Sequence, residues 1–224
     1  MEDLAFETNL CMFLFHIAMG KHKQSIDSRV LDRIIGKGKG WVFTPSDFQD
    51  LGSRTAVALA LMRHNRTGVI RQLARGLYDY PGQDPRLGVL SPSTDTIAQA
   101  LKGRDASRLQ PTGAYAANIL GLSDQVPIKT VFLTDGRSRR VRMGKREIAL
   151  KHTTLRNMAT AGTKSGLVIQ ALRWIGQRQV TDQTRAILRS RLSNDERRRL
   201  LKDVRYAPAW VAEIMRNLAE SGKD

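Results

Sequence analysis

Three segments between residues 25 and 65 carry apolar side chains at helical spacing. The first helix is predicted over residues 25–35, and the glycines of GKGKG end it. The pair Thr44-Pro45 predicts the start of a second helix over SDFQDL. Ser53 predicts the cap of a third helix, whose inner face is expected to hold Val57, Ala60, Leu61 and His64.

After Gly68 the pattern changes to that of short strands. Residues 69–73 and 77–80 predict a hairpin that turns through Ala74-Arg75-Gly76, and WVF at 41–43 is a third strand candidate. Gly76 is expected where the turn needs a positive φ, which a Cβ would penalise. The order of helices and hairpin predicts a winged helix-turn-helix domain over residues 24–81.

The rest of the chain predicts a second, mixed region. A Pro- and Gly-rich stretch after the hairpin looks like a linker, and residues 129–151 predict three strands separated by Asp135-Gly136 and Gly144-Lys145. We expect a small α/β domain with antiparallel strands over residues 82–153 and a helical region over residues 154–224. The predicted fold class is α+β, with a winged helix-turn-helix first, a small mixed α/β domain next and a helical segment last.

Residues 1–23 predict an N-terminal extension. Its apolar stretch, residues 9–19, is about half as long as a membrane helix needs, and its flank is acidic, unlike a secretory signal. One hypothesis is that translation begins at Met19 instead of Met1, which gives a uniformly basic protein. We expect no membrane association and a cytoplasmic protein.

The charge balance is strongly basic. The chain has 37 Lys and Arg against 21 Asp and Glu, a net charge of +16, which favours a polyanionic partner and makes nucleic acid the leading class. A single cysteine, Cys11, excludes an internal disulfide and a cysteine-based zinc site, and the four histidines are far apart. We therefore expect no metal site and no cofactor.

In a winged helix the third helix enters the major groove of double-stranded DNA and the wing reaches the backbone or minor groove. The candidate DNA-binding residues lie at the start of the third helix, further along it and in the wing: Ser53, Arg54, Thr55, Arg63, Arg66, Arg71, Arg75 and Gly76. Arginines suit phosphate and guanine contacts. For Tyr78 and Tyr80 we expect at least one to pack on the core, and for Arg197-Arg198-Arg199 a solvated helix face.

The best enzymatic alternative is a metal-dependent nuclease that uses Asp135, Glu147 and Lys151. Glu147 and Lys151 are four residues apart, about 13 Å along a strand, and Asp135-Gly136 is typical of a turn. The chain has no GxSxG, P-loop, HExxH or Rossmann glycine motif. We predict no catalytic residues and no enzyme activity.

Two stretches carry a family resemblance: GVIRQLARGLYDYP and RLQPTGAYAANILGLSDQVPIKTVFLTDGRSRRVRMGKREIALK. Over roughly residues 24–152 the chain resembles the AbiEi-type antitoxins and their relatives. The resemblance implies a winged-helix DNA-binding domain joined to a second α/β domain. The motif positions that carry DNA binding in the family correspond to residues 53–66 and 71–76. The chain departs from the family pattern at Leu59, Met62 and His64.

The resemblance also implies a function. We expect a bacterial antitoxin that represses its own operon by binding its promoter and counteracts a nucleotidyltransferase-like toxin encoded beside it. The alternative within the same class is a transcription regulator that acts without a toxin. The neighbouring reading frame distinguishes the two.

Overall fold

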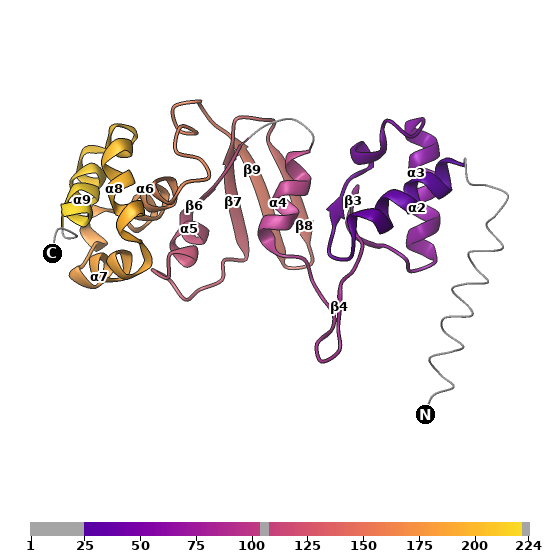
Figure 1. The fold of residues 1–224 in the computed structure, drawn as a ribbon, viewed down its shortest axis with the longest axis horizontal. Coiled ribbons are helices and arrows are strands. Elements are labelled where there is room, and N and C mark those ends of the chain that lie inside the picture. The colour runs from indigo at the N-terminus through magenta and orange to yellow at the C-terminus, as the bar shows by residue number, and fades with distance from the viewer. Residues whose placement is uncertain (1–24, 104–107, 221–224) are drawn as a thin grey trace. The chain divides into compact units, whose positions relative to one another are not determined.

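The computed structural model describes residues 25–103 and 108–220 (Figure 1). The predicted extension at residues 1–23 and the alternative start at Met19 lie outside the described residues. The chain divides into two compact units, with the boundary between Pro92 and Ser93. The class is mixed α+β, with helices and a small sheet first, a mixed sheet next and helices last, which confirms the predicted fold class.

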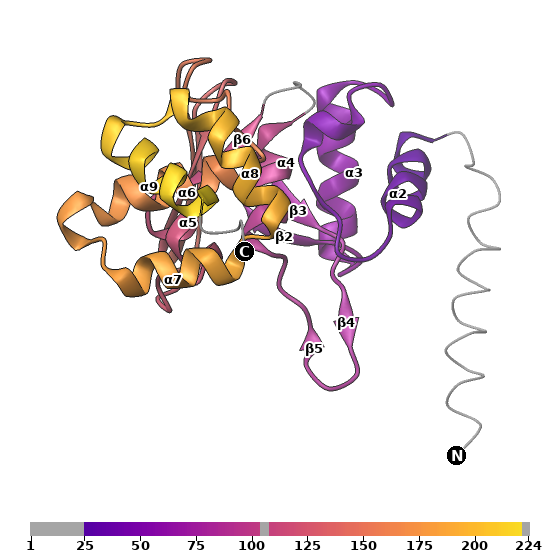
Figure 2. The ribbon, with the colours of Figure 1, turned by 60° about the vertical axis from the view of Figure 1, so that its left-hand side comes forward.

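The first unit has the topology of a winged helix-turn-helix. Its elements in chain order are α2 (Ile26–Lys37), β1 (Val42–Phe43), the 3-10 helix η1 (Pro45–Phe48), α3 (Arg54–Arg66), β2 (Arg71–Ala74) and β3 (Leu77–Asp79). The three strands pair antiparallel in the order β1-β3-β2, and Figure 2 shows α3 beside α2. The hairpin of β2 and β3 is the wing.

Local signals place the two long helices. Ser25 caps α2 by accepting a hydrogen bond from the Ser28 backbone N–H at 3.1 Å, and Gly38 ends the helix at φ 85°. Ser53 caps α3 in the same way, accepting from the Ala56 N–H at 3.3 Å. The predicted starts of these two helices are confirmed, and residues 42–43 of the strand predicted at 41–43 form β1.

The predicted second helix is a single 3-10 turn instead. The Asp47 carboxylate accepts a hydrogen bond from the Thr44 backbone N–H at 2.7 Å, which closes a capping box at the first turn. Only six residues separate Pro45 from Gly52. In so short a segment, backbone hydrogen bonds between residues i and i+3 replace those of an α-helix.

Aromatic side chains dominate the core of the first unit. The Phe43 ring lies 4.6 Å from that of Trp41, 5.4 Å from that of Phe48 and 6.1 Å from that of Tyr78, measured between centroids. Tyr80 also packs on this cluster, so the prediction that at least one of the two wing tyrosines packs on the core is confirmed. The helices contribute the fully buried Val30, Ile34, Val57, Ala60 and Leu61.

The stretch expected as a linker contains an ordered hairpin. Strands β4 (Gln83–Asp84) and β5 (Gly88–Val89) pair antiparallel, and Figure 2 shows them as a narrow ribbon that leaves the body of the first unit. The Asp84 carboxylate fixes the tip by accepting hydrogen bonds from the backbone N–H groups of Leu87 and Arg86, which lower the pKa of Asp84.

The second unit opens with a sheet and the helices beside it. In chain order these are α4 (Thr94–Lys102), β6 (Leu109–Thr112), α5 (Gly113–Ile119), β7 (Lys129–Thr134), β8 (Arg139–Met143) and β9 (Arg146–His152). The strand order is β6-β7-β9-β8. Strand β6 lies at an edge, where its Pro111 is tolerated.

The expectation of an antiparallel sheet needs a correction. Strands β6 with β7 and β8 with β9 pair antiparallel, but β7 and β9 pair parallel, from Lys129 opposite Glu147 to Thr134 opposite His152. Residues 135–138 are not a hairpin turn. They connect β7 to β8, and β9 lies between these two strands in the sheet. The end of β9 lies against this connection: the His152 N–H donates to the Ser138 hydroxyl at 3.0 Å, and His152 Nδ1 is 2.9 Å from the Gly136 carbonyl oxygen.

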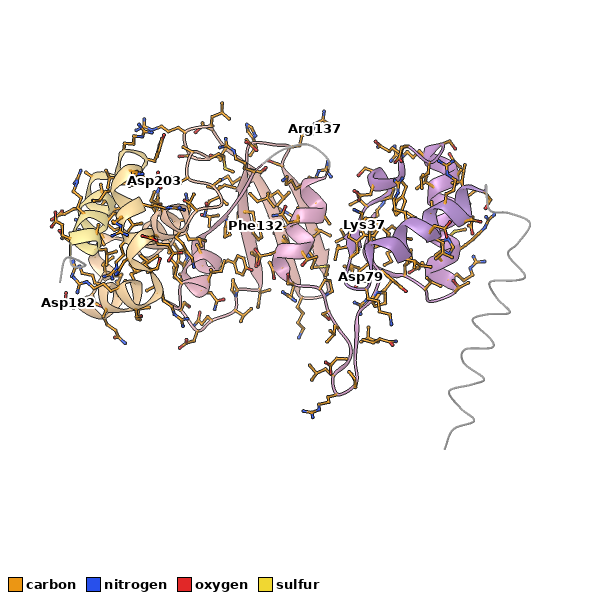
Figure 3. All side chains as sticks on the ribbon, in the orientation of Figure 1. Lys37, Asp79, Phe132, Arg137, Asp182 and Asp203 are labelled. Atoms are coloured by element: carbon orange, nitrogen blue, oxygen red, sulfur yellow. The ribbon has the colours of Figure 1, made fainter. Side chains whose placement is uncertain are left out.

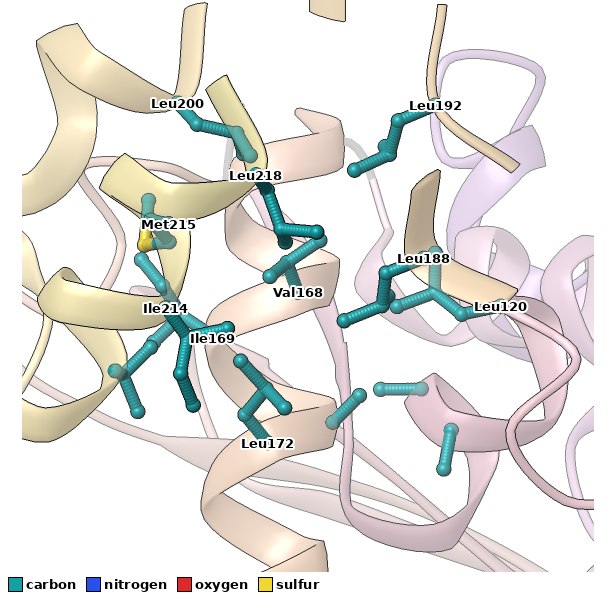
Figure 4. Packing of buried hydrophobic residues seen from close by; sticks show 14 residues of the cluster. Leu120, Val168, Ile169, Leu172, Leu188, Leu192, Leu200, Ile214, Met215 and Leu218 are labelled. Carbon is teal, nitrogen blue, oxygen red and sulfur yellow. The ribbon is translucent and has the colours of Figure 1, made fainter. Parts of the chain in front are cut away.

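Helices complete the second unit. They are α6 (Lys164–Ile175), η2 (Gln177–Gln179), α7 (Asp182–Arg191), α8 (Asn194–Asp203), η3 (Val204–Tyr206) and α9 (Ala209–Glu220). Ser193 and Glu196 form the predicted capping box at α8. Side chains of α5 join those of the last helices in one core, which Figure 4 shows around Leu120, Val168, Leu172, Leu188 and Met215. No helix within residues 25–103 and 108–220 is long and apolar enough to span a bilayer.

Candidate nucleic-acid interface

Helix α3 has one buried and one exposed face. Val57, Ala60, Leu61 and His64 are buried, as predicted. The exposed residues follow helical spacing in two adjacent rows: Arg54, Ala58, Met62 and Arg66, with Thr55, Leu59 and Arg63 beside them. Leu59 is 43% and Met62 46% exposed. The outer face therefore has cations at its two ends and a short apolar stretch between them.

The start of α3 exposes three of the predicted residues. Ser53 directs its hydroxyl to the Ala56 N–H, so this oxygen serves as the cap of the helix. Arg54 and Thr55 are exposed in the first turn, and no acidic side chain lies in that turn. Free backbone N–H groups at a helix start favour an anion, and a guanidinium beside them adds to this preference.

The two later arginines of α3 have different surroundings. Arg63 lies 3.4 Å from the Asp27 carboxylate, and its side chain is 64% exposed, so this ion pair is a loose surface contact. The buried His64 ring also faces Asp27, with Nε2 3.4 Å from its backbone oxygen. Arg66 is exposed at the end of the helix, and among the described residues it forms no ion pair with an acidic side chain.

Arg71 has a structural role. Its Nε and terminal amino group donate to the two carboxylate oxygens of Asp79 at 3.1 and 2.6 Å, and the same amino group donates to the Leu90 backbone oxygen at 3.0 Å. The Asp79 side chain is only 2% exposed. The hydrogen bond to Asp79 raises the pKa of Arg71. The guanidinium thus neutralises a buried carboxylate and ties β2 to β3 and to the following hairpin.

The turn of the wing holds the remaining two candidates. Gly76 has φ 72°, as predicted, and a Cβ placed on it would meet no heavy atom within 4 Å. Its requirement is therefore conformational. Arg75 precedes it and is exposed, and within the described part of the chain it has no acidic partner in an ion pair. The wing presents this one guanidinium at its turn.

The structure thus places most of the predicted residues on two features of the first unit, α3 and the turn of the wing. Ser53, Arg54 and Thr55 share the first turn of α3, Arg63 and Arg66 continue the same exposed face, and Arg75 with Gly76 forms the tip of the wing. Arg71 stands apart because Asp79 and Leu90 take up its donors.

The carboxylates of the nuclease alternative lie at opposite ends of strand β7. Asp135 follows Thr134, whereas Glu147 pairs with Lys129, so about 16–20 Å of strand separates them. Asp135 accepts hydrogen bonds from the backbone N–H and Nε of Arg108 at 2.7 and 3.1 Å. Burial acts to raise the pKa of Asp135, but these bonds hold it below its ordinary value. Its role is to join the beginning of β6 to the end of β7.

Glu147 is surrounded by cations. Its carboxylate lies 3.4 Å from Lys129, 3.5 Å from Arg140 and 3.4 Å from Arg142. Burial acts to raise the pKa of Glu147, but the charges of Arg140 and Lys129 and the hydrogen bond from Arg142 lower it. Lys151, the third residue of the alternative, is exposed further along β9.

Sequence reasoning gave no role to the most basic stretch of the chain. Residues 137–146, RSRRVRMGKR, hold six cations and no acidic residue, and they form β8 and its turn into β9. The density of like charges was the signal that could have drawn attention to them. We name residues 137–146 the cationic ribbon.

The comparisons with known proteins assign the chain to a family. No curated protein matches the sequence. The model of a family of unknown function, DUF6088, matches residues 29–200, which is most of the chain and includes the wing, α3 and the cationic ribbon. The protein is a member of the DUF6088 family.

Proposed function

We propose that the protein is a DNA-binding transcription regulator that serves as the antitoxin of a two-gene module and represses its own operon. In this proposal α3 enters the major groove of promoter DNA and the turn of the wing contacts the neighbouring backbone or minor groove. Repression is steric, because the bound protein excludes the polymerase. The protein itself carries out no chemical reaction.

The observation that carries the regulator proposal is the exposed face of α3 in a winged-helix topology. Arg54 and Arg66 stand at its two ends without an ionic partner among the described residues, and Arg75 adds a third such cation on the wing. Exposed guanidinium groups of this kind bind DNA phosphates, and binding releases the counterions that surround the DNA. The apolar Leu59 and Met62 between them suit contact with thymine methyl groups.

The antitoxin part of the proposal is supported by the resemblance to the AbiEi-type antitoxins. In that arrangement the first unit binds DNA and the second unit counteracts a nucleotidyltransferase-like toxin encoded nearby. The division of the chain between Pro92 and Ser93 is compatible with two such tasks. A regulator without a toxin remains the alternative, and it follows if no nucleotidyltransferase-like gene lies beside this one.

A promoter fusion tests the regulator. The intact protein is expected to repress a reporter placed behind its own upstream region, and Arg54→Ala with Arg75→Ala is expected to relieve repression. Arg178→Ala with Arg216→Ala removes the same number of charges from exposed positions of η2 and α9 and is the matched control. Equal repression by the wild type and the double variant would refute the assignment of α3 and the wing.

Co-expression tests the antitoxin. The intact chain is expected to restore growth of cells that express the neighbouring gene product, and the Arg54→Ala, Arg75→Ala variant is expected to restore it equally well. Growth arrest in the presence of the wild-type protein would refute the antitoxin proposal and would leave the regulator proposal standing. Loss of rescue in the double variant alone would place neutralisation on the DNA-binding surface.

A further inference from the structure

Most of the excess positive charge lies outside the winged helix. Residues 1–92 hold 12 Lys and Arg against 9 Asp and Glu, whereas residues 93–224 hold 25 against 12. The second unit therefore carries an excess of 13 of the total 16. A role for the winged helix in DNA binding leaves this charge without an explanation.

The cationic ribbon concentrates this charge on an edge of the sheet. Strand β8 is the outer strand, and its Arg139, Arg140 and Arg142 are exposed. Arg137 precedes the strand and Lys145 lies in the turn that follows it, both exposed and with no ion pair among the described residues. In Figure 3 the labelled Arg137 lies on the connection at one end of the strands.

The ribbon is held in place by contacts behind it. Arg146 donates to the Thr94 hydroxyl of α4 at 2.8 Å, and Val141 pairs with Ile148 in the buried layer. Gly144 closes the turn at φ 57°, in the left-handed region. The exposed guanidinium groups are therefore presented by a fixed strand, which lowers the entropy lost when they bind a partner.

The face that carries Arg140 and Arg142 also carries Glu147, the single acidic residue among the described residues of β6, β7, β8 and β9. Glu147 stands opposite Arg142 on one side and Lys129 on the other, so these four side chains keep a net charge of +2. The three cations are 59 to 75% exposed, so they remain open to a further anion. Glu147 orders the cations without cancelling them.

The rest of this face has aliphatic and polar side chains, including the exposed Lys151 of β9 and Gln110 and Thr112 of β6. Alternation along the strands places Val131, Leu133 and Ala149 on it, with no aromatic side chain among the described strand residues. Unpaired bases are bound by stacking on aromatic rings, which this face lacks. Arginines in a row about 7 Å apart on one strand instead suit the phosphates of a duplex.

We propose that the cationic ribbon is a second DNA-binding surface, which holds the phosphate backbone of double-stranded DNA without reading its sequence. Duplex DNA carries one negative charge per about 1.7 Å of axis, a density that matches this surface better than the mixed charges of a protein. The ribbon adds affinity and salt dependence, and the winged helix adds sequence preference. The inference does not depend on whether α3 recognises a promoter.

The test is the binding of the intact protein to a random-sequence DNA duplex at graded NaCl concentrations. Arg137→Ala with Lys145→Ala removes two cations of the ribbon that have no ion pair among the described residues, so the fold is expected to be unchanged. Arg178→Ala with Arg216→Ala removes two exposed cations from the C-terminal helical part and is the matched control. The ribbon variant is expected to bind about tenfold or more weakly at 0.1 M salt, with a salt slope lower by about 2.

A second variant tests the strand face itself. Arg140→Ala, Arg142→Ala and Glu147→Gln together remove the two strand arginines without leaving a lone carboxylate beside Lys129, and a loss of affinity is again expected. Equal binding by the ribbon variants and the control would overturn the inference. So would a loss that appears only with duplex RNA, or a loss of toxin neutralisation with DNA binding intact, which would assign the ribbon to a protein partner. All these outcomes can be interpreted even if the α3 and wing variants do not change binding to the promoter.

Discussion

Replacing Arg71 with alanine is expected to destabilise the first unit more than replacing its partner Asp79 with asparagine. In Arg71→Ala the Asp79 carboxylate, only 2% exposed, loses both guanidinium bonds and stays buried without a cation. Breaking a buried pair in this way costs about 3–5 kcal/mol. In Asp79→Asn the side chain still accepts one bond, and Arg71, 36% exposed, can be hydrated, so the cost is about 1–2 kcal/mol.

Urea unfolding followed by fluorescence measures this difference. Trp41 is the only tryptophan before Pro92 and lies in the aromatic core, so phenylalanine at Trp174 and Trp210 leaves it as the reporter of the first unit. Urea is preferred to guanidinium chloride because it does not screen the ion pair. Arg75→Ala removes an exposed cation of the same wing and is expected to change stability by less than about 0.5 kcal/mol.

Two results would refute this structural role of Arg71. If Arg71→Ala costs less than about 1 kcal/mol, or less than Asp79→Asn, the guanidinium does not support the wing, and Arg71 returns to the set of candidate phosphate contacts. The expected ranking would instead explain why an arginine in a wing strand is unavailable to DNA.

The remaining predictions concern the second unit. Gly166→Ala places a Cβ 2.3 Å from the Thr160 carbonyl oxygen and 2.4 Å from Gln110 Oε1, so a loss of about 1–3 kcal/mol is expected in urea unfolding followed through Trp210. Leu172→Ala opens a cavity in the core of Figure 4 and is expected to cost about 2–5 kcal/mol in the same assay; a smaller loss would show that the site collapses. Asp135→Asn tests a pH effect: because the pKa of Asp135 is lowered in the folded protein, its contribution is present above the unfolded pKa of about 3.9 and disappears as the pH falls through the folded value. The variant is expected to lose about 1 kcal/mol at pH 7 and to approach the wild type as the pH falls below the folded pKa of Asp135; a loss that does not change with pH would exclude the charge as the cause.

The parts of the fold that the sequence predicted are those set by local signals. Ser53 caps α3 and Ser193 with Glu196 caps α8, because each cap needs only residues within one turn. The strands β4 and β5 were missed because two residues each are too short to show a period. Strand β6 was missed because Leu109–Thr112 is only four residues long and contains a proline.

The parts that depend on distant pairing could not be predicted. The local sequence Asp135-Gly136 is typical of a hairpin turn. Because β9 pairs with β7, however, the chain crosses over β9 at this point to reach β8. In the wing, regular pairing from Ala74 opposite Leu77 would place Gln72 opposite Asp79. The irregularity between Gln72 and Ala74 shifts the register and places Arg71 there instead. This one-residue shift turns a predicted DNA contact into a buried ion pair.

The most direct test of the central claim is the salt dependence of binding to the protein's own upstream duplex, measured by fluorescence anisotropy for the wild type and for Arg54→Ala with Arg75→Ala. The account predicts tight wild-type binding whose logarithm falls linearly with the logarithm of salt concentration, and a slope lower by about 2 in the variant. Arg178→Ala with Arg216→Ala is expected to keep the wild-type slope. Identical slopes for all three proteins, or no binding of the upstream duplex at low salt, would contradict the account.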